Sequence, residues 1–383
     1  MNVTLDILSA MASIPAGGFL YQFLGARRDK RRFAGSGRWV EIGRGQKLFV
    51  VEKGSGGPAV LFEAGITATN LNWRHIQDKV ACSTATASYD RTGLGWSSSC
   101  RSSRTPGNIS VELHAMLGSA GIKPPYILVG HSFGGLVMRR YASMYPQDVA
   151  GVVLVDPMRC EEWPPLNPDK LEMIERGKKL SGYAIPIARF GLARLAVTSL
   201  LCRSGRLSGH LAGAGGTGGR HVLKRVTEEV GKMPREVWPV IAAHWSRPDY
   251  YIGMQRYVTA VPDTVAEMQN AEPIRDIPVL VLTPGKSTPL SDQCLAKIGN
   301  NVRQVIAADS AHWIHLDEPE LVIDSIHEMV ARVSGVALSA MTELTERQTV
   351  TSLDCNAALG VGLETQTPVI QPAGVTGGLH LRP

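Results

Sequence analysis

A serine between two glycines, set between a strand and a helix, constrains this 383-residue chain more than any other feature. Ser132 stands in the sequence Val-Gly-His-Ser-Phe-Gly-Gly, which has the Gly-x-Ser-x-Gly pattern. The apolar run 126–129 precedes the pattern, and the helix-like run 136–142 follows it. A sharp turn from strand to helix strains the serine backbone and crowds its flanks. The pattern therefore predicts that Gly130 and Gly134 make room for an exposed, nucleophilic serine; the alternative is an ordinary glycine-rich turn.

Strand and helix signals alternate on both sides of this pattern. Apolar or alternating runs predict strands at 39–42, 48–51, 59–64, 85–89, 126–129, 151–155, 278–282 and 302–307. Helical signals lie at 73–81, 109–119, 136–144 and 318–333. Strands that alternate with helices form parallel sheets with right-handed crossovers. The sequence therefore predicts an α/β fold with a doubly wound, mostly parallel sheet, in which the first two strands make a hairpin.

The alternation stops between residues 157 and 277, where the signals are helical. Helical runs lie at 171–180, 185–201, 222–230 and 236–244. The glycine run 213–219 follows no strand and lacks the Gly-Lys-Ser/Thr ending of a phosphate loop, so we interpret it as a connector. We expect residues 157–277 to be a helical lid inserted into a core of residues 34–156 and 278–335. Residues 336–383 are rich in Thr, Ser, Gly and Pro without periodicity, which predicts a disordered tail.

The N-terminal residues 1–33 form a region of their own. Residues 3–24 are mostly apolar and have the length of a membrane helix, although Asp6 and Pro15 interrupt them, and a basic cluster follows at 27–32. Three interpretations stay open: a membrane anchor or surface helix, a cleaved signal, and an amphipathic helix packed on its own domain. If the segment spans a membrane, the positive-inside rule places the basic cluster and all later residues in the cytoplasm. The expected localisation is therefore membrane-associated through the N-terminus or cytoplasmic.

Composition excludes several classes of protein. Apolar residues make up 44% and charged residues 19% of the chain, which excludes disorder throughout. Of the net charge of +6, the cluster at 27–32 supplies +5 − 1 = +4, so no nucleic-acid-binding face is expected. The six cysteines show no metal-ligand spacing, and we expect no metal. No pattern in the sequence indicates an oligomeric state.

A serine hydroxyl is a weak nucleophile at neutral pH and needs a base, which in this architecture follows the last strand. His312 is the first histidine after the strand at 302–307, and we expect it to be the base. His315 is the rival, which we interpret as a supporting residue. His131 precedes Ser132 directly, and we interpret it as a packing residue whose side chain points away from the serine.

The base in turn needs a carboxylate at the carboxyl end of a strand, which holds the imidazole tautomer. Asp156 directly follows the strand at 151–155, whereas Asp292 lies ten residues past the strand at 278–282. We therefore favour Asp156 as the acid and keep Asp292 as the alternative. Asp90 ends an earlier strand, and we interpret it as a residue that fixes its own loop through hydrogen bonds.

Acyl transfer also needs hydrogen-bond donors for the developing oxyanion, and backbone amides supply them without side chains. One donor is the amide of the residue after the nucleophile, which is Phe133. The other is expected in the loop after the strand at 59–64, where Ile66 follows Gly65. The predicted oxyanion hole therefore consists of the Ile66 and Phe133 amides.

Five short stretches together resemble the α/β-hydrolase superfamily over about residues 37–335. They are Glu63-Ala64-Gly65, Asp90–Ser97, the turn around Ser132, Leu154–Pro157, and His312 before Asp317-Glu318-Pro319. In one group of haloalkane dehalogenases the acid follows the strand that ends here at Val155, which implies Asp156. Those enzymes and the epoxide hydrolases use an aspartate nucleophile, whereas this chain has Ser132. Residues 21–40 resemble the membrane-proximal start of some bacterial members.

These observations predict a serine hydrolase that cleaves carboxylic esters of small molecules. Ser132 is expected to attack, His312 to shuttle the proton and Asp156 to orient the imidazole, without a cofactor. The same triad serves peptidases, thioesterases and carbon–carbon bond hydrolases, which remain alternatives. A ligand-binding member of the fold that has lost turnover is a further alternative from another class.

Overall fold

The computed structural model describes residues 3–99, 102–159, 168–202 and 229–335. Within them, eight strands form one sheet: β1 (Arg38–Glu41), β2 (Lys47–Lys53), β3 (Ala59–Glu63), β4 (Thr86–Asp90), β5 (Tyr126–His131), β6 (Val149–Val155), β7 (Val279–Pro284) and β8 (Val302–Ala307). The order across the sheet is β1-β2-β4-β3-β5-β6-β7-β8. β1, β2 and β4 pair antiparallel in succession, and every pairing from β4 to β8 is parallel. The expected doubly wound, mostly parallel sheet is confirmed.

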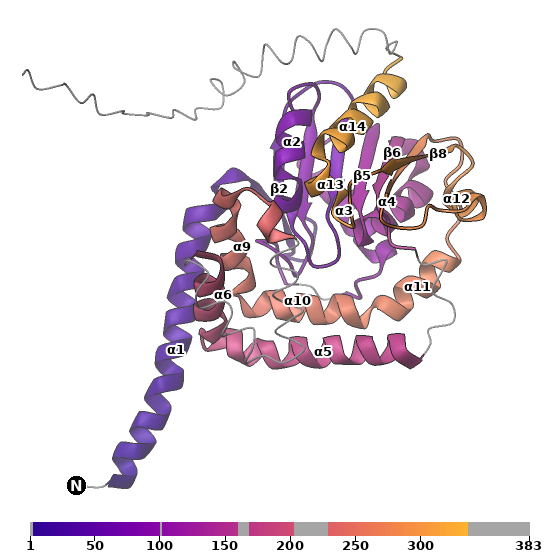
Figure 1. Cartoon of the computed structure of the whole chain (residues 1–383). Helices are drawn as coiled ribbons and strands as arrows, with labels where there is room; N and C mark the ends of the chain where they lie inside the picture. The colour runs from indigo at the N-terminus through magenta and orange to yellow at the C-terminus, as the bar shows by residue number, and fades with distance from the viewer. Residues whose placement is uncertain (1–2, 100–101, 160–167, 203–228, 336–383) are drawn as a thin grey trace, which may run out of the picture. The chain divides into compact units, whose positions relative to one another are not determined.

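Helices cover both faces of the sheet, because the central strands are apolar on both sides (Figure 1). On one face Ile127 and Val129 of β5 pack with α2 (Arg74–Val80) and α14 (Pro319–Val333). On the other face Leu128 packs with α3 (Pro106–Ala120) and α4 (Phe133–Met144). A short helix, α12 (Asp292–Ile298), joins β7 to β8. Successive side chains of a strand point to opposite faces, so this continuous apolar run builds two cores at once.

The described residues between β6 and β7 are mostly helical, as expected. They contain α5 (Pro168–Arg189), α6 (Leu192–Cys202), α9 (Trp238–Trp245), α10 (Pro248–Thr259) and α11 (Val261–Gln269). α5 and α10 run side by side (Figure 1). The expected connector at 213–219, most of the expected helix at 222–230 and the tail at 336–383 lie outside the described residues.

The expected break between helices at 171–180 and 185–201 was wrong in its position. α5 continues to Arg189, and the chain turns at Gly191, whose φ is +77°. A side chain there would also collide with Tyr21, because an added Cβ atom would lie 2.7 Å from its ring. Glycine is therefore required both by the backbone φ of the turn and by the contact with the N-terminal helix, and the local sequence pattern does not contain this contact.

The N-terminal residues form one long helix, α1 (Val3–Phe33), which includes Pro15. Its second half packs on the β6–β7 segment. The side-chain amide of Gln22 donates to the Ser246 carbonyl oxygen over 2.9 Å, and the Arg194 guanidinium pairs with Asp29 at 2.5 Å. Among the described helices, none is by itself long and apolar enough to span a membrane, and the bent pair α5–α6 passes only by length and composition.

Candidate active site

The turn after β5 holds Ser132 in a strained backbone conformation, with φ 54° and ψ −118°. The turn is crowded as the sequence predicts: a Cβ atom on Gly130 would lie 2.6 Å from the Gly134 carbonyl oxygen. A Cβ atom on Gly134 would lie 2.5 Å from the Glu63 carbonyl oxygen. Both positions therefore require glycine, and the serine is left partly exposed at the start of α4.

Backbone hydrogen bonds join the Ser132 turn to the end of β6. The Ser132 amide donates to the Val155 carbonyl oxygen over 3.1 Å, and the Met158 amide donates to the Ser132 carbonyl oxygen over 3.1 Å. Asp156, the next residue after β6, has a φ of +40°, which turns its side chain out of the strand direction. Ser132 and Asp156 thus lie at the carboxyl ends of neighbouring parallel strands.

The structure brings His312 and Asp156 together across 156 residues of sequence. His312 Nδ1 lies 2.7 Å from Asp156 Oδ2, and the imidazole side chain is 47% exposed. When Nδ1 donates its proton to a carboxylate, the lone pair that can accept a proton is on Nε2. The imidazole is therefore oriented by a carboxylate while one ring nitrogen remains available at the surface.

The rival residues lie in different surroundings. His315 is buried, neither of its ring nitrogens has a hydrogen-bond partner among the described residues, and burial lowers its pKa to about 3. Its ring packs against Trp73, with 4.8 Å between the centroids. Asp292 is exposed in the first turn of α12. Neither residue is arranged as His312 and Asp156 are.

His131 links the serine turn to the His312 loop. Its Nε2 donates to the His312 carbonyl oxygen over 2.8 Å, and its ring packs against His312, Trp313 and His315. Burial and the two neighbouring histidines keep its pKa well below the usual value, so the ring is neutral. His131 is therefore a packing residue, as expected, and it also fixes the backbone that carries His312.

Phe133 and the loop that carries Ile66, which we predict to supply the oxyanion donors, are near the serine in the fold. Phe133 begins α4, where the first amides of a helix lack partners within it. A Cβ atom on Gly65 would lie 3.7 Å from Ser132 Cβ, so the loop that carries Ile66 runs past the serine. Within the described part of the chain, neither the Ile66 nor the Phe133 amide donates to another backbone carbonyl.

A buried charged group supports this loop, and the sequence analysis did not identify it. Arg91 Nη2 donates to the Gly65 carbonyl oxygen, and Arg91 Nη1 lies 3.3 Å from Glu63 Oε1. Tyr89 donates its hydroxyl to the other Glu63 oxygen. Burial raises the Glu63 pKa, and the Arg91 charge opposes that shift. In the sequence, Tyr89 and Arg91 stand at the end of the apolar run that forms β4. The structure adds that β4 pairs with β3, which carries Glu63.

Asp90 fixes its own loop, as expected. It accepts hydrogen bonds from the Asn70 amide at 3.0 Å, the Asn70 side chain at 2.7 Å and the Trp96 amide at 2.9 Å. Burial raises its pKa to about 6, against the effect of these donors. The carboxylate therefore joins Asn70, in the segment after β3, to Trp96, in the loop after β4. These hydrogen bonds hold the two loops and do not orient His312.

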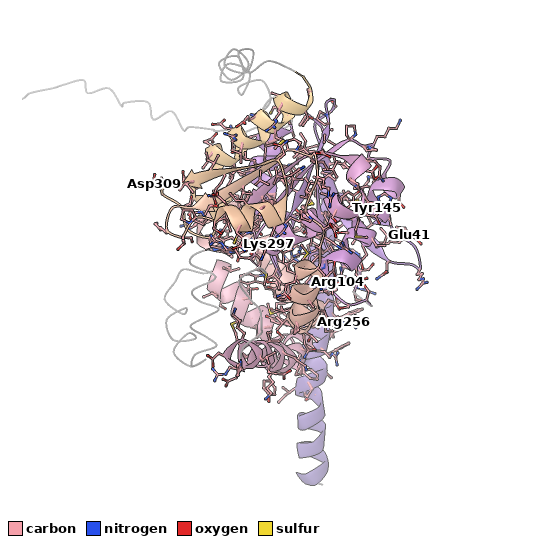
Figure 2. The ribbon with its side chains drawn as sticks, turned by 90° about the vertical axis from the view of Figure 1, so that its right-hand side faces the viewer. Glu41, Arg104, Tyr145, Arg256, Lys297 and Asp309 are labelled. Carbon is pink, nitrogen blue, oxygen red and sulfur yellow. The ribbon has the colours of Figure 1, made fainter. Side chains whose placement is uncertain are left out.

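The β6–β7 segment packs over this end of the sheet. Tyr257 of α10 meets the Phe133 ring edge-on at 5.9 Å and lies over the Arg91 guanidinium at 4.9 Å. Arg104 also stacks on Tyr257, at 5.4 Å, and pairs with Glu112. Figure 2 shows Arg104 in the same region as Arg256 of α10. The inserted helices therefore contact the residue that follows the serine.

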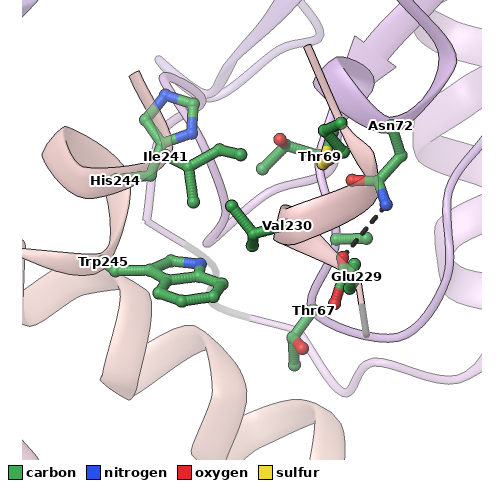
Figure 3. Close-up of a pocket in the computed structure, with 10 residues that line it drawn as sticks. Thr67, Thr69, Asn72, Glu229, Val230, Ile241, His244 and Trp245 are labelled. Carbon is green, nitrogen blue, oxygen red and sulfur yellow. Dashed lines mark hydrogen bonds between the residues drawn. The ribbon is translucent and has the colours of Figure 1, made fainter. Parts of the chain in front are cut away.

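A small pocket lies between the loop after β3 and the inserted helices (Figure 3). Its volume is about 10 Å³, close to that of one water molecule. The Asn72 side chain donates to Glu229 across it over 3.0 Å, which links the core to the insertion. His244 lines it, and burial lowers the pKa of this histidine to about 3. Among the described residues, no group of His, Cys, Asp and Glu is arranged to hold a metal ion.

Comparisons with known proteins agree with this architecture. Residues 60–325 match the model of the alpha/beta hydrolase family. Over 105 residues the chain is 35% identical to the uncharacterized protein YqjL of Bacillus subtilis, which covers 27% of this chain and 42% of that protein. The chain spans less than half the length of the curated relatives that it matches.

Solved structures share the fold at low sequence identity. The epoxide hydrolase CorEH superposes with a TM-score of 0.57 at 17% identity, over 78% of this chain and 99% of that chain. A thermophilic esterase from Thermogutta terrifontis superposes with a TM-score of 0.55 at 18% identity, over 78% of this chain and 98% of that chain.

Proposed function

Because the chain belongs to the alpha/beta hydrolase family, we propose that it is a serine hydrolase that cleaves carboxylic esters. The observation that carries this proposal is the hydrogen bond of 2.7 Å between His312 and Asp156, at the strand end next to Ser132. Fold alone does not assign a reaction, whereas these three side chains together support one.

In the proposed reaction, the Ser132 hydroxyl oxygen attacks the ester carbonyl carbon while His312 Nε2 takes the hydroxyl proton. Asp156 stabilises the imidazolium that forms. The carbonyl oxygen becomes an oxyanion that accepts hydrogen bonds from the Ile66 and Phe133 amides. The tetrahedral intermediate collapses, the alcohol leaves with the proton from His312, and the acyl group stays on the serine.

Water then completes the cycle. His312 removes a proton from a water molecule, whose oxygen attacks the acyl carbon, and the second intermediate releases the acid and returns the proton to Ser132. Apart from water, no step needs a second substrate, and none needs an oxidant or a reductant. The exposed imidazole face and the partly exposed serine are compatible with direct access of water.

In this proposal the β6–β7 segment acts as a lid. Tyr257 of the inserted helices and Phe133 belong to one apolar cluster, and Ile66 packs against that cluster. An apolar cover over the reacting atoms excludes water from one side and strengthens the electrostatic interactions beneath it. We propose that this cluster contacts the acyl or alcohol group of a small to medium apolar ester.

The proposal is tested by labelling the purified chain with a fluorophosphonate probe and by assaying p-nitrophenyl esters of two to eight carbons. We expect labelling at Ser132, found by mass spectrometry of peptides, and ester turnover. A chain that is labelled but cleaves only thioesters, peptides or carbon–carbon bonds would contradict the ester assignment and keep the serine nucleophile. An unlabelled chain would be a binding protein instead.

Arg91→Lys is expected to lower kcat for an ester by about tenfold or more, with a smaller change in KM. Lysine keeps a positive charge beside Glu63, but its single ammonium group does not hold both the carboxylate and the Gly65 carbonyl in the planar arrangement of arginine. The loop that carries Ile66 then loses its support, and one oxyanion donor is displaced.

Arg104→Lys is the matched control for this variant. Arg104 is equally buried and stacks on the same Tyr257, but it pairs with Glu112 on α3, whereas Arg91 donates to the Gly65 carbonyl oxygen. Its kcat should stay close to that of the original chain at a similar loss of melting temperature. Equal losses of kcat in the two variants would show that Arg91 acts only through stability.

A further inference from the structure

Apolar side chains gather on the surface of α1 instead of facing a core. From Ile14 to Leu24 they lie on the side of the helix that does not pack on the inserted helices, and they are largely exposed: Ile14 77%, Phe19 52%, Leu20 54%, Phe23 42% and Leu24 54%. A patch of this size on a water-soluble surface marks an interaction site.

The β6–β7 segment extends the same apolar surface. Around the turn between α5 and α6, Phe190 is 41%, Leu192 58% and Leu195 53% exposed. These side chains and Ile14 and Tyr21 of α1 line one groove with a volume of about 580 Å³. All its lining residues are apolar apart from the tyrosine hydroxyl.

Tertiary contacts lock the two parts of this surface together. The Phe190 carbonyl lies so close to Gly18 that a Cβ atom there would be 2.5 Å from the carbonyl oxygen. Arg194 Nε donates to the Gln22 side chain over 3.0 Å, and Arg194 pairs with Asp29. Residues separated by about 170 positions therefore form one surface, which we call the α1–α6 surface.

A basic cluster borders the α1–α6 surface at the C-terminal end of α1. Arg27, Arg28, Arg31 and Arg32 line a second groove together with Leu24, and Lys30 lies over the Trp39 ring. From residue 13 to the end of α1 the only acid is Asp29, and Arg194 already neutralises it. The charge next to the apolar patch is therefore positive and uncompensated by α1 itself.

We propose that the α1–α6 surface docks on a lipid bilayer that carries anionic headgroups. Apolar side chains from α1 and from the α5–α6 turn enter the interfacial region, and the basic cluster contacts the lipid phosphates. The proposal differs from a simple N-terminal anchor, because it assigns part of the contact to the inserted helices. The apolar segment with a basic border fits a membrane better than a second copy of the chain, since the described α1–α6 surface offers no free acid for a partner's arginines.

Docking in this way connects the bilayer to the proposed lid. α5 continues from the docked turn and packs along α10, which carries Tyr257 over Phe133. An apolar ester dissolved in the membrane would thus meet the inserted helices first. This consequence rests on the proposed function, whereas the docking itself does not.

The experiment is vesicle flotation of the purified full chain with phosphatidylcholine vesicles, with and without 30% phosphatidylglycerol. We expect flotation with the anionic vesicles and weaker flotation at high salt. The double variant Leu192→Asp/Leu195→Asp should reduce the bound fraction at a given lipid concentration by about tenfold or more, because two charges enter the apolar contact. The double variant Arg28→Glu/Arg31→Glu should lose binding to anionic vesicles chiefly.

Val111→Asp is the matched control, because Val111 is 51% exposed on α3 and lies outside the α1–α6 surface. It should float as the original chain does, and all variants should keep their hydrolysis of a soluble ester and their circular dichroism spectrum. Unchanged flotation of the Leu192/Leu195 variant would overturn the composite surface and leave only an N-terminal anchor. If the chain formed a dimer without lipid and the Leu192/Leu195 variant dissociated it, the surface would belong to a second copy of the chain. An equal loss of flotation in the Val111→Asp control would also contradict the proposal.

Discussion

Replacing Ser132 by alanine is expected to lower the turnover of a p-nitrophenyl ester by about 10⁶, down to the level of residual binding and oxyanion effects. The proposed mechanism has no second group that takes over the attack, because His312 and Asp156 act only on the proton of the serine. The variant should remain folded, since alanine loses no hydrogen bond that holds the turn: the Ser132 contacts to Val155 and Met158 use backbone atoms.

The measurement is the initial rate of the purified variant, with its melting temperature as a check of folding. Ser119→Ala serves as the control, because Ser119 is exposed on α3, outside the serine turn. It should keep the original rate. A Ser132→Ala protein that retains a large part of the activity would remove the serine from the mechanism.

Replacing Asp156 by asparagine is expected to lower kcat by about 10⁴, the second largest effect. The asparagine amide can donate to His312 Nδ1, which favours the tautomer with its proton on Nε2, and that nitrogen then no longer accepts the serine proton. Asparagine keeps the size of aspartate and tolerates the backbone φ of +40°, so the strand end should not move.

Asp292→Asn is the matched control, and it should keep nearly the original kcat because its side chain is exposed at the start of α12. Both variants are compared by kcat and by melting temperature. If Asp292→Asn were the inactive protein while Asp156→Asn stayed active, the acid would follow β7 instead of β6. Ser132 and His312 would keep their proposed roles in that case.

The predicted core elements depend on interactions that are local in the sequence. The continuous apolar run of β5, the glycines around Ser132 and the helical periodicity after the serine are all visible within about twenty residues. The spacing of apolar residues in such patterns follows the side-chain period of a strand or a helix, so these patterns predict the elements and the strained turn between them. The inserted helices were predicted less well, because their breaks depend on partners such as Tyr21 that lie far away in the chain.

The sequence by itself determined that Ser132 sits on a tight turn after a buried strand, and that a carboxylate and a histidine follow later strands. Only the tertiary structure decided which of them meet: the parallel register of β5 and β6 and the return of the chain after β8 bring Asp156 and His312 within 2.7 Å. The same holds for Arg91 on the Gly65 loop and for Arg194 on α1. The physical reason is that these contacts join residues far apart in sequence, and their geometry exists only once the sheet and its helices have packed.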